Sequence, residues 1–401
     1  IYNAGIYIAE EYVRIEGLSV KTSIGSDIYF ISPDGAGDVR ISNCYGHYSG
    51  TGNTRVYDIY DVGALTVNIW NCIGITDSAD STSRAFYLND ADATAYIYNC
   101  TGIANAGVAF RQNGGTGTLK NCLGYTSASD TAFSGTWSSV TYSASDDLTA
   151  DDWGVDNNRT AQVFSFAGSG DYHLANNDAG AKNFGTNLST DAAISFSTDI
   201  DGAGRVDGSW DIGADEVPRQ IYYSVGTRTS NLNNSANVTI TNGNTATLTV
   251  GQPSNIGVGD KIDYDADNKI AYIKGRVSNT VYTVQSATGA PVTNATDVTV
   301  NSIKRTFNSL SSAENNSDEA SYLGSADLVS NNVRLYWPCY ADPTPTSGQL
   351  DLESEYITGP DNYIKVYTPF APDEVGTSQR HDGRWRDSGY RHYTPSAGGT
   401  P

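Results

Sequence analysis

Ile41-Ser42-Asn43-Cys44-Tyr45-Gly46 is the stretch that decides the fold of this chain, because the same frame returns three more times. Each copy has an aliphatic residue two positions before an Asn-Cys pair and a glycine two positions after it. The copies begin at Ile41, Ile69, Ile97 and Leu119, and their Asn residues (Asn43, Asn71, Asn99 and Asn121) are separated by 28, 28 and 22 residues. A repeat of this length, made of short alternating segments, is typical of a solenoid in which each repeat forms one coil.

Weaker copies of the frame lie on both sides of these four. Upstream, Gly17 stands at the Asn position, and downstream Tyr142 stands there. Between the frames lie short alternating runs such as Ile28–Ile31, bounded by Gly, Asp, Asn and Ser. Period-two alternation between such residues indicates strands and turns, not helices. We therefore expect an all-β fold in which residues 1–145 form the coils of a right-handed parallel β-helix.

Stacking of the coils places each Asn beneath the next one and each Cys beside it. Asn tolerates the left-handed conformation of a sharp turn, and its amide can donate and accept along the stack, so the four Asn residues are predicted to form a ladder. The neighbouring thiols are predicted to point inward, and they belong to Cys44, Cys72, Cys100 and Cys122. A coil step of roughly 4.8 Å would permit disulfides. We favour free thiols, because stacked side chains point in parallel and free Cys is often buried.

The composition limits the classes of partner. The chain has 401 residues and a net charge of −21, so nucleic acids and anionic membranes gain nothing from contact with it. No run approaches the ~20 apolar residues of a membrane-spanning helix. The chain contains no Met, which indicates a processed product or an excerpt. Its few Lys residues and many Ser, Thr, Asn and Gly residues favour an extracellular or cell-surface protein of a prokaryote or virus, although five Cys residues give no disulfide framework.

Residues 146–219 carry motifs that resemble a known family. The motifs are Asp171-Tyr172-His173-Leu174, Asp199-Ile200-Asp201-Gly202, Arg205 and Asp211-Ile212-Gly213-Ala214-Asp215-Glu216. Their combination resembles the closing segment of secreted bacterial right-handed parallel β-helix proteins with pectate-lyase-like repeats. The resemblance covers residues 1–217. It implies that this segment caps the β-helix and that Arg205 pairs with Asp201, Asp211 or Glu216.

Residues 220–300 have a different texture. Strand-like runs alternate with turns, which predicts a small β-barrel or sandwich. These runs are Ala236–Ile240, Ala246–Val250, Ala271–Lys274 and Val281–Val284.

One turn of this region resembles the start of a calcium loop, with Asp263, Asp265 and Asp267 at alternate positions. However, Asn268 replaces the turn glycine and Lys274 replaces the bidentate Glu of that motif. Structural calcium therefore stays open beside the alternative of a solvated hairpin turn, and we expect no other cofactor.

Residues 301–401 are predicted to open a second β-helix. Ser302–Ala320 is predicted to be a helix with Ile303, Phe307 and Leu310 on one face. Short strands are predicted after it, at Val333–Tyr336, Leu350–Leu352 and Tyr363–Tyr367. A helix that leads into successive short strands commonly plugs the open bottom of a β-helix.

The order of these parts suggests how copies meet, because the chain begins in solenoid coils and ends in the opening coils of another. Three explanations stay open: one period of a tandem array, a fragment cut at an arbitrary point, or separate subunits that stack end to end. Charge favours contact between the ends. Arg380, Arg384, Arg386 and Arg391 outnumber Asp382 and Asp387 near one end, and the other offers Glu10, Glu11 and Glu16. Such surface pairs set register more than affinity.

We expect a structural subunit or tandem repeat of an extracellular filament, a homopolymer that grows head to tail by continuation of the β-helix. An adhesin or viral tail fibre that binds surface glycans through exposed aromatic residues is the first alternative. A polysaccharide lyase or hydrolase is the second, and we expect no such activity. The solenoid lacks a recurring cluster of bases and carboxylates, and His47 and His173 are isolated in the sequence. The charge of −21 would also repel polyuronates.

Overall fold

The structure is a computed structural model that describes residues 4–60, 63–127, 131–154, 157–205, 209–353 and 355–394. It divides into two compact units, Ile1–Val217 and Pro218–Pro401, and each has its own hydrophobic core. Among the described residues, no helix is both long and apolar enough to span a membrane. The predicted all-β class is confirmed.

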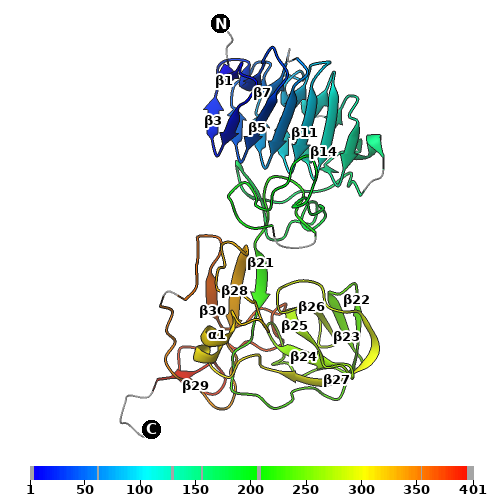
Figure 1. Cartoon of the computed structure of the whole chain (residues 1–401). Coiled ribbons are helices and arrows are strands. Elements are labelled where there is room, and N and C mark those ends of the chain that lie inside the picture. The colour runs from blue at the N-terminus through cyan, green and yellow to red at the C-terminus, as the bar shows by residue number, and fades with distance from the viewer. Residues whose placement is uncertain are drawn as a thin grey trace. The chain divides into compact units, whose positions relative to one another are not determined.

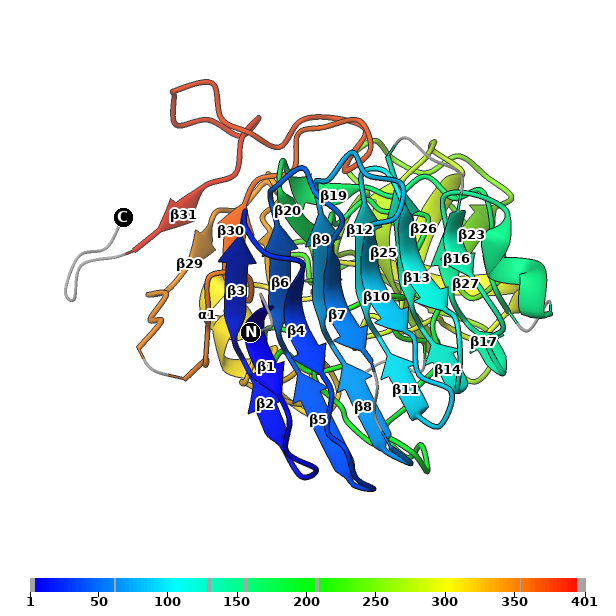
Figure 2. The same cartoon turned by 90° about the horizontal axis from the view of Figure 1, so that it is seen from above.

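The first unit is a parallel β-helix built from three sheets of six strands, which Figures 1 and 2 show as stacked coils. Sheet A contains β1 (Ala4–Ile8), β4 (Asp27–Ile31), β7 (Arg55–Ile59), β10 (Arg84–Leu88), β13 (Val108–Gln112) and β16 (Thr131–Ser134). Sheet B contains β2 (Arg14–Glu16), β5 (Asp38–Ser42), β8 (Thr66–Trp70), β11 (Thr94–Tyr98), β14 (Thr116–Lys120) and β17 (Ser139–Thr141). Sheet C contains β3 (Ser19–Thr22), β6 (Tyr45–Tyr48), β9 (Ile73–Thr76), β12 (Thr101–Ala104), β15 (Leu123–Thr126) and β18 (Ala144–Ser145).

The repeated frame forms the corner between sheets B and C. Its Asn residues adopt left-handed backbone conformations, with φ of 52°, 51°, 47° and 53° at Asn43, Asn71, Asn99 and Asn121. The weaker copies follow the same rule, since φ is 70° at Gly17 and 50° at Tyr142. The predicted turn is therefore confirmed in all six coils. This conformation costs free energy in a residue other than glycine, and the cost is smaller for Asn than for most residues.

The glycine of each frame makes room for a buried aromatic stack. Rings of sheet A follow one another at centroid distances of 4.7, 4.6, 4.8 and 5.1 Å through Tyr29, Tyr57, Phe86, Phe110 and Phe133. A Cβ atom added to the third of these glycines, Gly102, would lie 2.8 Å from the Phe110 ring. The frame therefore encodes both the corner and the clearance for the core opposite it.

The last coil of the β-helix is covered by the chain that follows it. A short 3-10 helix, Thr149–Trp153, lies at this end, and Ala150 is buried in the core. Asp147 accepts the N–H of Ala132 at 2.7 Å, and Thr149 Oγ1 accepts that of Phe133 at 2.9 Å. After the hairpin β19 (Phe166–Gly168) and β20 (Asp171–Leu174), the chain runs in loops to Val217.

The second unit contains a closed six-stranded antiparallel barrel. Its strands are β22 (Asn237–Thr241), β23 (Thr245–Leu248), β24 (Lys261–Tyr264), β25 (Lys269–Arg276), β26 (Val281–Gln285) and β27 (Ala295–Lys304). The four predicted runs fall on β22, β23, β25 and β26.

Beside the barrel, the second unit also contains short parallel sheets. One has the order β21 (Arg219–Tyr222), β28 (Val333–Pro338), β30 (Ile364–Tyr367), and the other pairs β29 (Thr346–Ser347) with β31 (His392–Tyr393). The chain thus makes two successive parallel rungs, β28 with β29 and then β30 with β31. The strand predicted at Leu350–Leu352 is absent there, and Thr346–Ser347 is extended in its place.

The predicted helix is shorter than expected. Helix α1 spans Leu310–Asn316, and the Ser309 side chain caps it by accepting the N–H of Ser312. Placing Ile303 on that helix was wrong, because Ile303 pairs with Ile262 in the barrel and is fully buried there. Barrel pairing therefore overrides the helical spacing of the sequence.

A buried ion network joins the barrel to the parallel rungs. Arg305 lies 2.7 Å from Asp260 and 3.2 Å from Asp342, and all three side chains are shielded from solvent. The guanidinium also lies 3.7 Å from the centre of the Tyr340 ring. Buried charges are tolerated only with such partners, so the network fixes how the two parts of this unit meet.

Candidate functional site

The Asn side chains of the repeated frame hold the closing segment. Nδ2 of Asn43 donates to the carbonyl oxygens of Asp199 at 2.6 Å and Ile200 at 3.1 Å. Nδ2 of Asn71 donates to the carbonyl oxygen of Thr198 at 2.7 Å. These contacts tie two coils to the same short stretch of the closing segment.

The next two coils use the same residue type. Nδ2 of Asn99 donates to the carbonyl oxygen of Gly213 at 3.1 Å. Asn121 makes two bonds to Thr186, as donor to its carbonyl oxygen at 2.8 Å and as acceptor of its N–H at 2.9 Å. The predicted Asn ladder is present only where Nδ2 of Asn121 donates to Oδ1 of Asn99 at 3.0 Å. The other amides bond to the closing segment instead, because its backbone carbonyls lie along this corner.

The Cys column is a buried apolar row. Cys44, Cys72, Cys100 and Cys122 are free thiols with no exposed surface, as predicted. Each thiol donates to a backbone carbonyl oxygen, such as Cys122 to Ile97 at 3.1 Å. Burial raises the pKa of Cys122 to about 12, which makes the thiolate form unfavourable and the thiol unreactive.

Arg205 is the central clamp of the closing segment. Its side chain has no exposed surface and pairs with Glu216 at 2.8 Å. The guanidinium also donates to the carbonyl oxygens of Gly213 at 3.0 Å and Ala214 at 2.8 Å. Of the three acids left open by the sequence, Glu216 is therefore the one whose carboxylate pairs with Arg205, while Asp211 accepts from Arg205 through its backbone carbonyl oxygen at 3.3 Å.

The other two carboxylates have different roles. Asp211 accepts backbone N–H groups from Asn183 at 2.7 Å and Val217 at 2.8 Å. Asp201 lies 3.1 Å from Nε2 of His173. The closing segment is thus held by contacts of its acidic side chains, of which Asp211 is buried and Asp201 exposed, more than by regular secondary structure.

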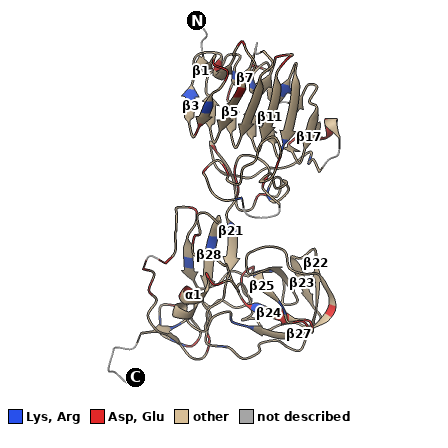
Figure 3. Cartoon of the chain, viewed as in Figure 1, with Lys and Arg blue, Asp and Glu red and all other residues tan. Residues whose placement is uncertain are grey.

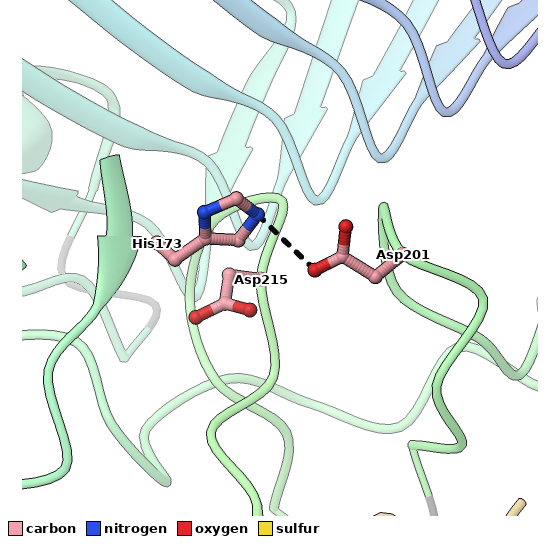
Figure 4. A group of neighbouring side chains, drawn as sticks. All are labelled: His173, Asp201 and Asp215. Carbon is pink, nitrogen blue, oxygen red and sulfur yellow. Dashed lines mark ion pairs between the residues drawn. The ribbon is translucent and has the colours of Figure 1, made fainter. Parts of the chain in front are cut away.

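Three motifs far apart in the sequence meet at His173, as Figure 4 shows. His173 lies on β20, Asp201 follows in the next motif, and Asp215 belongs to the last one. Ligand atoms of these three side chains all lie within 4.8 Å of one another. The second ring nitrogen of His173 lies 2.5 Å from Asp171. His173 therefore sits between two carboxylates, with a third nearby.

The electrostatics of this cluster favour a charged imidazole. The contact with Asp201, together with the Asp215 charge and the Asp171 bond, raises the pKa of His173 to about 10. Burial, and next the Asp199 charge, raises the pKa of Asp215 to about 7. At neutral pH the His173 side chain is therefore an imidazolium, and its contacts with Asp171 and Asp201 tie strand β20 to the loop that carries Asp201.

The same three side chains are those that could hold a divalent cation, with Asp171 orienting the imidazole. That state requires a neutral imidazole, so a cation and the His173 proton would compete. In the sequence alone His173 is isolated from other histidines, although the motif Asp171–Leu174 that contains it is part of the family resemblance. Only the folded chain brings the three motifs together. His47, the other isolated histidine, pairs with Asp77 at 2.7 Å.

The three barrel carboxylates lie at the β24–β25 hairpin. Asp265 has φ of 68° and pairs with Lys269 at 2.7 Å, and Asp263 accepts a bond from Asn301 at 3.1 Å. Within the described residues, Asp263, Asp265 and Asp267 belong to no ligand group of three or more acids, histidines or cysteines. This geometry is that of a charge-paired hairpin turn.

The charged residues proposed for assembly are mostly exposed. Glu10, Glu11 and Glu16 lie on the first coil and are exposed. In the second unit, Arg386 pairs with Asp382 and Arg391 with Asp387 at 2.6 Å. Arg380 lies over the Phe370 ring, and Arg384 is exposed. Two of the four arginines are thus already neutralised within the chain.

No protein-family model, curated protein or solved structure matches this chain.

Proposed function

We propose that this protein is a structural subunit or tandem repeat of an extracellular filament, built head to tail by continuation of the parallel β-helix from one copy to the next. The observation that carries the proposal is a pair of sheet edges with unpaired backbone groups, one on the first coil of the β-helix and one on the last parallel rung of the second unit. Among the described residues, β1, β2 and β3 each pair on one side only, and so do β30 and β31.

The two edges complement each other. In a parallel stack, each coil pairs with the coil before it along one edge and with the coil after it along the other. Among the residues that the structure describes, the first-coil edge has no earlier strand beside it, and the β30–β31 edge has no later one. A row of free backbone groups is costly to leave exposed and is a natural template for strand addition. Such a contact joins unlike surfaces and does not close on itself, which is the geometry of a fibre.

The core columns are also open at the first coil. Ile6 continues the aromatic column of Tyr29, and Ile15 continues the aliphatic column of Ile41. Both side chains remain partly exposed. The opposite end of this β-helix is covered by residues 146–153. Within the first unit, the first coil is therefore the end at which another copy can add strands.

The second unit repeats the chemistry of the Asn corner. Asn332 has φ of 47°, and Nδ2 of the buried Asn362 donates to Oδ1 of Asn332 at 3.0 Å. Stacked Asn residues thus occur in both units, as expected if the rungs of one copy and the coils of the next form one right-handed β-helix. The exposed Arg384 and the acids of the first coil would add register to this contact.

The proposal places the protein outside the cell or at its surface, as the sequence resemblance to secreted bacterial proteins and the net charge of −21 suggest. It assigns no catalytic role to the chain. Its partners are further copies of itself.

A single substitution at the β30 edge tests the proposal. The carbonyl oxygens of Tyr363 and Tyr367 accept the N–H groups of Leu335 in β28 and of Cys339 directly after it, so Val366 directs its backbone groups to the free side. Val366→Pro removes the free-side donor and leaves the β28 ladder intact. Val366→Thr keeps the donor and is the matched control.

We expect light scattering to detect concentration-dependent chains for the wild type and for Val366→Thr, and single copies for Val366→Pro. Wild-type protein that stays monomeric at every concentration, or a proline variant that assembles normally, would refute the proposal.

A further inference from the structure

The outer face of the β21–β28–β30 sheet carries a cluster of tyrosines. Tyr222 and Tyr336 lie side by side on neighbouring strands, with ring centroids 4.7 Å apart and planes inclined by 20°. Tyr363 and Tyr367 approach Tyr336 edge-on at 6.4 and 6.2 Å. Ile221 and Leu335, which alternate with these residues, point into the core instead. We call these four tyrosines the tyrosine platform.

Basic side chains border the platform. Nζ of Lys365 lies 5.5 Å from the ring centre of Tyr336 and 4.7 Å from that of Tyr367. Arg334 lies 5.6 Å from the ring centre of Tyr363. The basic segment of β28 and that of the strand beside it are blue in Figure 3. Tyr222, Tyr363 and Tyr367 are only partly buried, so ring surface remains available to a ligand.

A cavity of about 300 Å³ adjoins the platform at Tyr222. The barrel contributes Lys274, Arg276 and Thr283 to its wall, and a later loop contributes Asp373 and Glu374. This volume is at the small end of ligand pockets, with room for one sugar ring and not for a folded segment.

The polar groups of the cavity are of both signs. Nη1 of Arg276 donates to the carbonyl oxygen of Pro372 at 3.3 Å, and its Nε–H is buried without a hydrogen-bond partner among the described residues. Glu374 accepts the N–H of Phe370 at 3.0 Å. The Asp373 side chain is exposed and makes no ion pair or hydrogen bond within the described parts of the chain.

This combination selects one class of ligand. A metal ion would be repelled by Lys274 and Arg276, and a simple anion by Asp373 and Glu374. A purely apolar ligand would leave the Nε–H of Arg276 and the carboxylate of Asp373 without partners among the described residues. A polyhydroxyl compound satisfies both, because each hydroxyl donates to a carboxylate and accepts from a cationic N–H. Tyrosine rings offer an amphipathic surface for the apolar face of a neighbouring ring.

We propose that the cavity and the tyrosine platform form a saccharide-binding site. One sugar ring occupies the cavity between Asp373 and Arg276, and the adjoining sugar lies on the partly exposed ring of Tyr222. This function goes beyond end-to-end assembly, because the site uses side chains on the outer face of the β21–β28–β30 sheet, whereas the proposed junction uses the free backbone edge of β30.

The test is a glycan array followed by calorimetric titration of the full chain with the best-bound free mono- or disaccharide. Asp373→Ala removes the exposed acceptor without breaking a contact of the fold. Asp351→Ala, another exposed acid of the same unit, is the matched control. We expect Asp373→Ala to weaken saccharide binding by about tenfold or more, as for the loss of a charged hydrogen bond, and Asp351→Ala to leave it unchanged.

A second readout locates the sugar. Saturation-transfer NMR should report magnetisation passing from aromatic protons to the sugar C–H groups. Three outcomes overturn the proposal: no saccharide binds, binding is equal in Asp373→Ala and the wild type, or the array is silent while a peptide occupies the cavity.

Discussion

At the residue scale, the Asn of the repeated frame performs two tasks. Its backbone adopts the left-handed turn at the corner of each coil, and its amide bonds to the closing segment. The first task is a property of the residue and its neighbours, so the sequence reveals it. The second depends on a chain segment that is distant in sequence, 65 positions away for the bond from Asn121 to Thr186 and 127 for the bond from Asn71 to Thr198.

Substitution of Asn71 separates these tasks. Asn71→Gly keeps the left-handed turn and loses only the amide bond, so we expect a loss of about 1 kcal/mol in the free energy of unfolding. Asn71→Val also pays for the left-handed backbone and should lose about 1–2 kcal/mol more. Denaturant unfolding of both variants measures the difference. Equal losses would contradict a backbone role for Asn71.

At the element scale, the sequence predicts those elements whose contacts lie within or between neighbouring repeats. The coils around the Asn-Cys frame could be predicted because each strand pairs with the equivalent strand of the next repeat. The helix at Ser302–Ala320 was predicted too long, because Ile303 belongs to a barrel strand whose partner, Ile262, is distant in sequence. The cluster at His173 requires strand β20 and the two loops that carry Asp201 and Asp215 to converge, which no local pattern encodes.

The closing segment should have a pH-dependent stability. The pKa of His173 is raised from an ordinary 6.5 to about 10, so its contribution is complete below pH ~6.5 and is lost as the pH rises through 10. Asp215 also lowers the stability as the pH rises, but at lower pH. Its pKa is raised to about 7, so the stability that its protonated form contributes is lost as the pH rises from ~4 through 7. We therefore expect the melting temperature of the full chain to fall between pH 6.5 and 10.

His173→Gln should flatten that pH dependence, because the variant cannot carry the charge that binds Asp171 and Asp201. His381→Gln, an exposed histidine outside the cluster, controls for the substitution itself. Thermal unfolding followed by circular dichroism is the measurement. A steep fall that persists in His173→Gln would assign the pH dependence to other groups.

At the scale of the whole molecule, each unit contributes one of the two sheet edges that the proposed filament joins. The first contributes long regular coils with one covered end and one open edge. The second contributes two parallel rungs whose later strands, β30 and β31, each have one unpaired edge among the described residues, and a barrel joined to the rungs through the Arg305 network. In the proposed filament, each junction between copies lies inside a β-helix and is as regular as the coils themselves.

The most direct test of this account is an electron cryo-microscopy map of assembled wild-type protein. We predict continuous β-helix density in which β30 and β31 of one copy stack on the first coil of the next at a strand spacing of roughly 4.8 Å. A map in which copies meet through other surfaces, or in which both edges remain bare, would contradict the account.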